Sequence, residues 1–520
     1  MNDSDSPGTD PLVVRTDSGW IRGTREEKVR SWRGVPFGAS TAGARRFRAA
    51  EPVPSWDGVR DCTEFGAVAP QPTYSWTDRI DGDEDCLHLD VVRPDTDKQL
   101  PVVVYIHGGS FIVGSSHMLM LRGFQLAEQM DVVYVSINFR LGALGYLDLR
   151  SLDGECSANP AVTDQLLALQ WVKKNIAAFG GDPDNITLMG ESAGGAAVLT
   201  LMAVPQAEGL FHRAIAQSPP IAMIHSRRQS TFWARELVNR LALPRATTID
   251  TLREEPFADI VRAGQSMMWR AGELRRLNSC YAPTVDGELI PDHPFEVFKQ
   301  GKQHQVPLLL GTNSDEASFS KYILQRSSAR ARAGHRLLAS FDQEHAPEVV
   351  AAYGGSHARA DFAALLADAL FWAPTVRIAE KHSRTQPTWM YRFDFAPAAL
   401  RWLGLGAMHS LELSNIFGDA SASRLKMLTT MGNSSDMENL TVTMQQHWAA
   451  FMHEGRPLDS WPLYDAAHDR KTLIFDVEPH VVEDPYAERR EAWADYDMRE
   501  WGNGSTDLLD RLGYAALSFE

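Results

Sequence analysis

The chain has 520 residues, of which 44% are hydrophobic and 23% are charged. This composition is typical of a globular protein with a sizeable core, and it excludes wholesale disorder. The formal net charge is −16, from 51 basic and 67 acidic side chains. Because such a surface repels phosphate groups, we expect no nucleic acid partner.

The first residues lack the basic and apolar regions of an export signal. No apolar run approaches the roughly 20 residues that span a bilayer. We therefore expect a cytoplasmic protein with no membrane partner. Residues 1–10 are expected to form a disordered acidic tail ahead of a single domain over residues 11–520. The sequence gives no signal for an oligomeric state.

Short apolar runs alternate with helical patterns along the chain. The runs predict strands at Pro101–Ile106, Val132–Asn138, Ile186–Met189, Ala214–Gln217, Val306–Leu310, Trp389–Phe395 and Thr472–Val477. Helical spacing follows at Asp164–Ala178, and an apolar helix is expected at Ala196–Val204. This alternation predicts an α/β fold with a large, mainly parallel sheet and helices on both faces.

Two charged, helix-favouring stretches interrupt this pattern, at about 223–282 and 327–383. We expect them to be helical insertions. They could cap a site above the sheet, or they could be structural padding, and the sequence does not separate these two interpretations.

The segment Gly190–Gly194 reads Gly-Glu-Ser-Ala-Gly and lies between an apolar strand and an apolar helix. In that context a GxSxG pattern predicts a sharp turn that exposes the central serine as a nucleophile. A bare GxSxG pattern also occurs by chance. The flanking strand and helix favour Ser192 as a nucleophile.

A serine nucleophile needs a base and donors for the oxyanion. The glycine-rich stretch His107–Phe111 follows a strand and could supply backbone donors, or it could be only a tight turn. His409 lies in a loop after the strand at Trp389–Phe395 and suits the base. Asp315 and Glu316 both follow an earlier strand and suit the acid.

Taken together, the motifs resemble the type-B carboxylesterase family, which includes cholinesterases and bacterial para-nitrobenzyl esterases. The resemblance rests on blocks in the correct order over most of the chain: GVPF at 34–37, EDCL at 84–87, HGGSF at 107–111, GESAGG at 190–195, GTNSDEAS at 311–318 and AMHSLELSNIFG at 407–418. It implies an α/β-hydrolase fold.

The resemblance also assigns roles to the triad. It implies that Ser192 is the nucleophile, that His409 is the general base, and that Glu316 rather than Asp315 is the acid that orients the imidazole. It also implies that the oxyanion hole is formed by the backbone amides of Gly109, Ser110 and Ala193. Gly108 would permit the turn. Ser110 departs from the usual Gly or Ala, but a backbone N–H serves equally well.

Four further positions are compared through the resemblance. Glu191, Ser218 and Glu412 correspond to a buried polar network behind the triad, which would hold the histidine loop. Cys86 corresponds to one half of the family's first disulfide, but Ala69 stands where its partner is expected. The sequence leaves open whether Cys62 pairs with Cys86, and the missing cysteine agrees with a reducing compartment.

From these residues we expect a carboxylic ester hydrolase that acts through an acyl-enzyme on small to medium uncharged esters. No cofactor or metal is expected. An amidase or carbamate hydrolase with the same triad is the nearest alternative. A non-catalytic, cholinesterase-like binding domain is a further alternative, which the presence of serine, acid and histidine together disfavours.

Overall fold

The computed structural model describes residues 10–499 and 501, apart from 27, 74–78, 153, 245–246, 269–278, 323 and 420–433. Residues 1–9 of the expected tail thus lie outside the described residues. In the described chain, eleven strands form one sheet in the order β16-β15-β14-β13-β12-β11-β9-β10-β8-β4-β3. Their bounds are β3 Thr24–Glu26, β4 Val29–Pro36, β8 His88–Pro94, β9 Leu100–Ile106, β10 Val133–Ile137, β11 Gly181–Glu191, β12 Arg213–Gln217, β13 Leu308–Asn313, β14 Thr388–Phe393, β15 Thr472–Phe475 and β16 His480–Val482.

The middle of this sheet is parallel, from β15 through to β10, and both edges are antiparallel. These parallel strands coincide with the runs that the sequence predicts, so the expected α/β-hydrolase architecture is confirmed. Smaller sheets lie outside it, one of β1 (Val13–Arg15), β2 (Trp20–Arg22) and β5 (Val59–Asp61), the other of β6 (Gln71–Pro72) and β7 (Ile80–Asp81).

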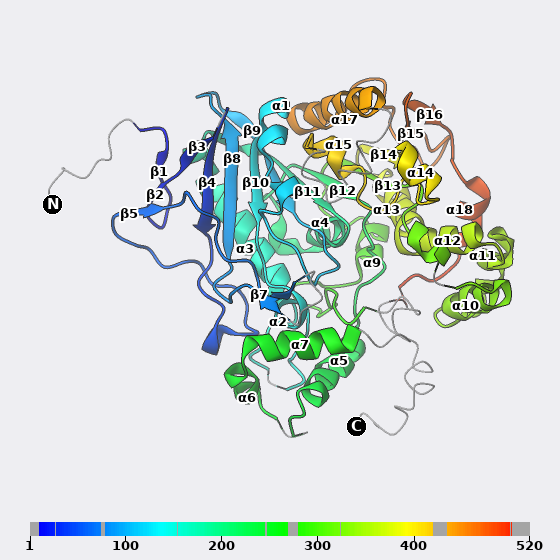
Figure 1. Ribbon diagram of the computed structural model, residues 1–520, viewed down its shortest axis with the longest axis horizontal. Helices are drawn as coiled ribbons and strands as arrows, with labels where there is room; N and C mark the ends of the chain where they lie inside the picture. The colour runs from blue at the N-terminus through cyan, green and yellow to red at the C-terminus, as the bar shows by residue number, and fades with distance from the viewer. Residues whose placement is uncertain are drawn as a thin grey trace.

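Side chains of the parallel strands are buried on both faces, as β9 illustrates. Val102 and Val104 belong to one apolar cluster, whereas Val103 and Tyr105 belong to another. The first cluster packs on α3 (Pro160–Asn175), α4 (Ala193–Ala203), α9 (Pro294–Lys299) and α13 (Ala373–His382), and the second on α1 (Phe124–Met130), α15 (Leu413–Phe417) and α17 (Ser434–Glu454). Helices thus cover both faces (Figure 1).

Element ends differ from the predicted ones for local reasons. Helix α3 begins at Pro160, ahead of the expected start at Asp164, because proline fits the first turn of a helix where no N–H partner is needed. Strand β13 continues past Leu310 to Asn313, because its last residues pair with β14 up to Phe393.

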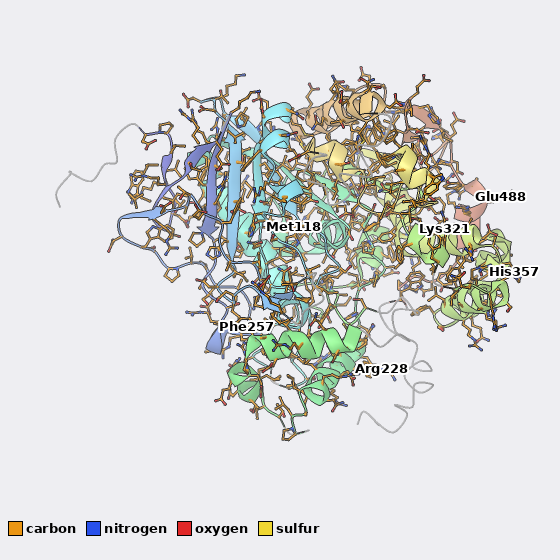
Figure 2. The ribbon with its side chains drawn as sticks, viewed as in Figure 1. Met118, Arg228, Phe257, Lys321, His357 and Glu488 are labelled. Atoms are coloured by element: carbon orange, nitrogen blue, oxygen red, sulfur yellow. The ribbon has the colours of Figure 1, made fainter. Side chains whose placement is uncertain are left out.

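Each stretch expected to be an insertion is helical. The first contains α5 (Arg227–Arg240), α6 (Ile249–Glu254) and α7 (Phe257–Met268), which lie together below the sheet in Figure 1. The second contains α10 (Ser327–Ala339), α11 (Ala346–Ala352) and α12 (Arg359–Ala367) and ends in α13. Figure 2 labels Phe257 and Arg228 in the first group and His357 in the second, at separate edges of the molecule.

Residues Arg359–His382 form a helical stretch that is long and apolar enough, by length and composition alone, to cross a membrane. Our expectation that no run approaches that length was therefore wrong. The stretch combines α12, a π-helical turn η8 (Asp368–Trp372) and α13. In this fold 72% of its most apolar window is buried inside the protein, as in a core helix.

All four cysteines, Cys62, Cys86, Cys156 and Cys280, are buried and free. Cys62 and Cys86 therefore do not pair. Burial raises the pKa of Cys62 to about 12, so this thiol stays protonated and unreactive near neutrality.

A buried arginine, Arg46, ties the first insertion to the body of the fold. Arg46 binds Glu84 through two nitrogens, at 2.6 and 2.5 Å, and the two side chains are only 7% and 6% exposed. The same guanidinium donates to the carbonyls of Leu252, Arg253 and Glu255 at the end of α6. Arg46 thus caps α6 and neutralises Glu84 at once.

We predict that Arg46→Ala lowers the free energy of unfolding by about 3–5 kcal/mol, because it leaves Glu84 buried without a counter-charge. Denaturant unfolding followed by fluorescence measures this. The control is Arg45→Ala, since Arg45 pairs with Glu51 where the side chains are 49% and 53% exposed. An exposed pair contributes about 0–1 kcal/mol, so equal losses from the two variants would contradict the anchoring role.

Candidate active site

Ser192 occupies the turn between β11 and α4 with φ 57° and ψ −124°. Residues with a Cβ rarely adopt this backbone conformation, which marks a strained position. The glycines on either side make it possible. A Cβ at Gly190 would lie 2.5 Å from the carbonyl of Gly194, and one at Gly194 would lie 2.0 Å from the carbonyl oxygen of Ile106. The spacing of the motif therefore follows from steric contacts.

His409 and Glu316 complete a chain of hydrogen bonds with this serine. Ser192 Oγ lies 2.9 Å from His409 Nε2, and His409 Nδ1 lies 2.5 Å from Glu316 Oε2. Because a carboxylate only accepts, Nδ1 carries a proton, and Nε2 of the neutral ring is left to accept from the serine. The three side chains come from the ends of different elements, after β11, after β13 and in the loop that follows α14 (Ala398–Trp402).

Glu316 is 1% exposed and is held from its other oxygen. Ser218 Oγ donates to Oε1 at 2.5 Å, and the backbone N–H of Asn313 donates to the same oxygen at 2.8 Å. Asp315 instead receives the Lys321 ammonium at 3.4 Å and the amide of Ala407 at 3.3 Å. Of the two acids that the sequence left open, only Glu316 is therefore bonded to His409.

Glu191 and Glu412 are two further buried carboxyl groups near the ring. Glu191 Oε1 lies 3.4 Å from His409 Nε2 and accepts from Ser410 Oγ at 2.5 Å. Glu412 accepts from the side-chain amides of Gln217 at 3.2 Å and Asn313 at 2.6 Å. Burial, together with the carboxyl groups of Glu191 and Glu316, raises the pKa of Glu412 to about 8.

The same charges act on the imidazole. Burial by itself lowers the pKa of His409, but the carboxylates of Glu191 and Glu316 outweigh it and raise the value to about 9. The surroundings therefore favour the imidazolium form. The ring can accept a proton only in its neutral form, so the fraction able to do so grows as pH rises toward about 9.

The loop after β9 brings backbone donors beside the serine. A Cβ at Gly108 would lie 2.8 Å from the carbonyl oxygen of Glu191 and 3.1 Å from Cβ of Ser192, so glycine permits the approach. Gly109 has φ 118° and Ser110 has φ 57°. Within the described residues, the amides of Gly109, Ser110 and Ala193 donate no hydrogen bond to other protein groups, which leaves them available for an oxyanion.

A cavity of about 380 Å³ opens over these residues, and its walls are mainly apolar. Both insertions contribute to the walls; the first supplies Met223, Trp233, Met267, Ser279 and Cys280, and the second supplies Leu370 and Phe371. The insertions therefore cap the site, as one of the two interpretations expected. Among the described residues that line this cavity, the titratable side chains are those of Glu316, His409 and Cys280.

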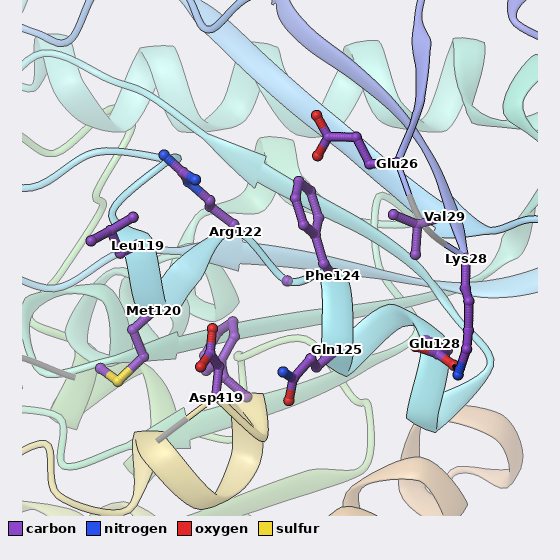
Figure 3. A pocket seen from close by; sticks show the side chains of 12 residues that line it. Glu26, Lys28, Val29, Leu119, Met120, Arg122, Phe124, Gln125, Glu128 and Asp419 are labelled. Atoms are coloured by element: carbon purple, nitrogen blue, oxygen red, sulfur yellow. Dashed lines mark hydrogen bonds and ion pairs between the residues drawn. The ribbon is translucent and has the colours of Figure 1, made fainter. Parts of the chain in front are cut away.

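Another cavity, of about 440 Å³, lies beside α1 (Figure 3). Its described lining includes acidic and basic side chains, and Lys28 forms an ion pair with Glu128 there at 2.5 Å. No serine, cysteine or histidine is among those described residues. It therefore lacks the combination of serine, histidine and acid that is found at the cavity over Ser192.

Fold and site together define a serine hydrolase of the α/β type. The family model described as the carboxylesterase family matches residues 10–493, and the chain belongs to this family. Para-nitrobenzyl esterase of Bacillus subtilis (strain 168) is 33% identical over 92% of this chain and 98% of its own length. Phenmedipham hydrolase of Pseudarthrobacter oxydans is 31% identical over 91% and 97%.

Solved structures agree with this result. A para-nitrobenzyl esterase structure superposes with a TM-score of 0.84 at 33% identity, covering 93% of this chain and 99% of the other. A carboxylesterase of Geobacillus stearothermophilus gives 0.81 at 31% identity, covering 93% and 100%. The protein is a serine carboxylic ester hydrolase.

Several polar residues of the site were missed by the sequence analysis. The buried carboxyl groups accept hydrogen bonds from Asn313, Gln217 and Ser410. Each of these residues lies within a few positions of a predicted site residue, and this proximity in the sequence could have pointed to them. Phe371 packs against His409 in a tilted arrangement with ring centroids 4.5 Å apart. No sequence pattern marked Phe371, because it lies in a stretch identified only as helical.

We predict that Glu191→Gln moves the acid limb of the pH profile of kcat/KM to lower pH. The carboxylate raises the pKa of His409, so its removal lets the ring lose its proton earlier. Glu412→Gln is the control and should move the limb less, because Glu412 bonds to Gln217 and Asn313 rather than to the ring. Hydrolysis rates of a chromogenic ester between pH 5 and 10 give the profile. Equal shifts in both variants would contradict this assignment.

Proposed function

We propose that the chain hydrolyses small to medium uncharged carboxylic esters with Ser192 as nucleophile, His409 as general base and Glu316 as orienting acid. The observation that carries the proposal is the continuous chain of hydrogen bonds, 2.9 and 2.5 Å long, that ends at a serine on the floor of an apolar cavity. The family membership supports the ester as the bond that is cleaved.

In the first half-reaction, Ser192 Oγ attacks the carbonyl carbon of the ester while its proton passes to Nε2 of His409. The carbonyl oxygen gains a negative charge, which the amides of Gly109, Ser110 and Ala193 stabilise. When the tetrahedral intermediate collapses, the C–O bond to the alcohol breaks. His409 then returns its proton to the departing alkoxide, which leaves an acyl-enzyme.

The second half-reaction repeats these steps with water. His409 takes a proton from water, the hydroxide attacks the acyl carbon, and the carboxylic acid leaves as Ser192 Oγ regains the proton. In both halves the ring becomes an imidazolium beside two carboxylates. Three neighbouring side chains stabilise this imidazolium. Glu191 and Glu412 act on it electrostatically, and Ser218 holds Glu316 in place by a hydrogen bond.

The substrate class follows from the walls of the cavity. Its described lining has no lysine or arginine, so an anionic acyl or alcohol group would lose its hydration without gaining a counter-ion. Apolar acyl and alcohol groups are instead favoured by burial against residues such as Trp233 and Phe371. A volume of about 380 Å³ suits a small to medium ester.

We predict that Ser192→Ala lowers kcat by about 10⁴-fold or more and abolishes covalent labelling by an organophosphate, because no other group takes over the attack. Glu316→Gln should lower kcat by about 10²–10⁴-fold while labelling remains measurable but slow. Mass spectrometry of the labelled protein gives the readout. The control is Ser340→Ala at the end of α10, away from the cavity lining, which should react as the wild type does.

We further predict that para-nitrophenyl esters are hydrolysed with an optimum below the laurate in a series from acetate to laurate. The ester should turn over faster than the matched amide, because an alkoxide leaves more readily than an amine nitrogen, and faster than the matched carbamate, because its nitrogen makes the carbonyl carbon less electrophilic. Steady-state kinetics on the series measure both. A carbamate that turns over faster than its ester would favour the alternative of a carbamate hydrolase.

A further inference from the structure

The stretch Arg359–His382 is not a regular helix where it faces the cavity. Five residues, Asp368–Trp372, form a π-helical turn between α12 and α13. Such turns are rare and occur frequently at functional sites, because they widen the helix and redirect its side chains. Leu370 and Phe371 of this turn both line the cavity over Ser192.

Phe371 is in direct contact with the imidazole. The two ring centroids are 4.5 Å apart and the ring planes are inclined by 31°. The hydrogen bonds of His409 to Ser192 and Glu316 lie along the edge of the ring and define an axis. An imidazole held only at two edge nitrogens can still tip about that axis. A packed aromatic ring on its face opposes this motion.

We propose that Phe371 is a positioning residue for the hydrolytic reaction, holding the face of His409 and stabilising its imidazolium form. The negative face of an aromatic ring attracts a cation within about 6 Å. Every step of the proposed mechanism passes through the imidazolium, so this attraction would favour the transition states over the reactive form with a neutral ring. The inference rests on the proposed role of His409 as general base.

Other groups that face His409 act from different directions. Glu316 bonds Nδ1 at 2.5 Å, Glu191 lies 3.4 Å from Nε2, and Glu412 adds a weaker electrostatic effect. These carboxyl groups come from the strand ends and from the histidine loop itself. Phe371 comes from a helix, so its contribution can be removed without disturbing them.

Buried contacts hold the π turn in place. Asp368, at its start, accepts from Tyr353 Oη at 2.5 Å and from Arg489 at 3.2 Å, and Trp493 Nε1 donates to the same tyrosine oxygen at 2.9 Å. Arg489 and Trp493 belong to α18 (Ala487–Trp493), the helix in which Figure 2 labels Glu488. The carbonyl of Phe371 accepts from Thr375 Oγ1 at 2.7 Å. These contacts hold the turn that carries the Phe371 ring.

The test compares Phe371→Leu, Phe371→Tyr and Leu370→Ala by kcat, KM and the pH profile of kcat/KM. Phe371→Leu should lower kcat about twofold to thirtyfold and move the acid limb to lower pH, because the imidazolium loses its aromatic partner. Phe371→Tyr retains the ring face and should restore both quantities. Leu370→Ala alters the same turn and the same cavity, so it should change KM while the limb stays in place.

An unchanged pH profile and kcat in Phe371→Leu would overturn the inference, as would a shift of the same size in Leu370→Ala. The activity of Ser192→Ala separates this result from a failure of the proposed function. If Ser192→Ala remains active, the assignment of the triad is wrong. If Ser192→Ala is inactive and Phe371→Leu has the pH profile of the wild type, only the role of Phe371 is refuted.

Discussion

Glu191, Glu316 and Glu412 are buried around one imidazole, with exposed fractions of 3%, 1% and 0%, and the rest of the site depends on how this charge is compensated. Hydroxyl and amide donors compensate part of this negative charge, and the raised pKa of Glu412 favours its neutral form. What remains favours a proton on His409. Under the proposed mechanism this environment raises the basicity of the ring and stabilises each transition state, while the alkaline pKa limits activity at low pH.

The body of the fold and the insertions contribute differently to this site. Strand ends of the parallel sheet hold the serine turn and the acid, where backbone contacts leave no room for a Cβ at Gly108 or Gly194. The insertions supply the cavity walls, and the first is joined to the body by hydrogen bonds from Arg46 to carbonyls at the end of α6. Changes in the insertions can therefore alter the substrate while the reacting groups stay in place.

The sequence predicted the parallel strands and the serine turn because each depends on local patterns, an apolar run or a glycine at fixed spacing. It could not choose between Asp315 and Glu316 from the residues alone, because the two are adjacent and the loop geometry decides which one reaches His409. The resemblance was needed for that choice. Nor could it find Phe371, whose position depends on the packing of a helix far from His409 in the sequence.

The stretch Arg359–His382 shows why composition alone misleads. Its apolar character resembles that of a membrane-spanning helix, yet α13 packs Val376, Ile378 and Ala379 among buried residues of the core. On the preceding turn, Leu370 and Phe371 face an apolar cavity instead. A helix with the sheet on one side and an ester pocket on the other needs apolar residues on both. The same composition therefore reflects two apolar surfaces within one folded protein, and the π turn lies where one gives way to the other.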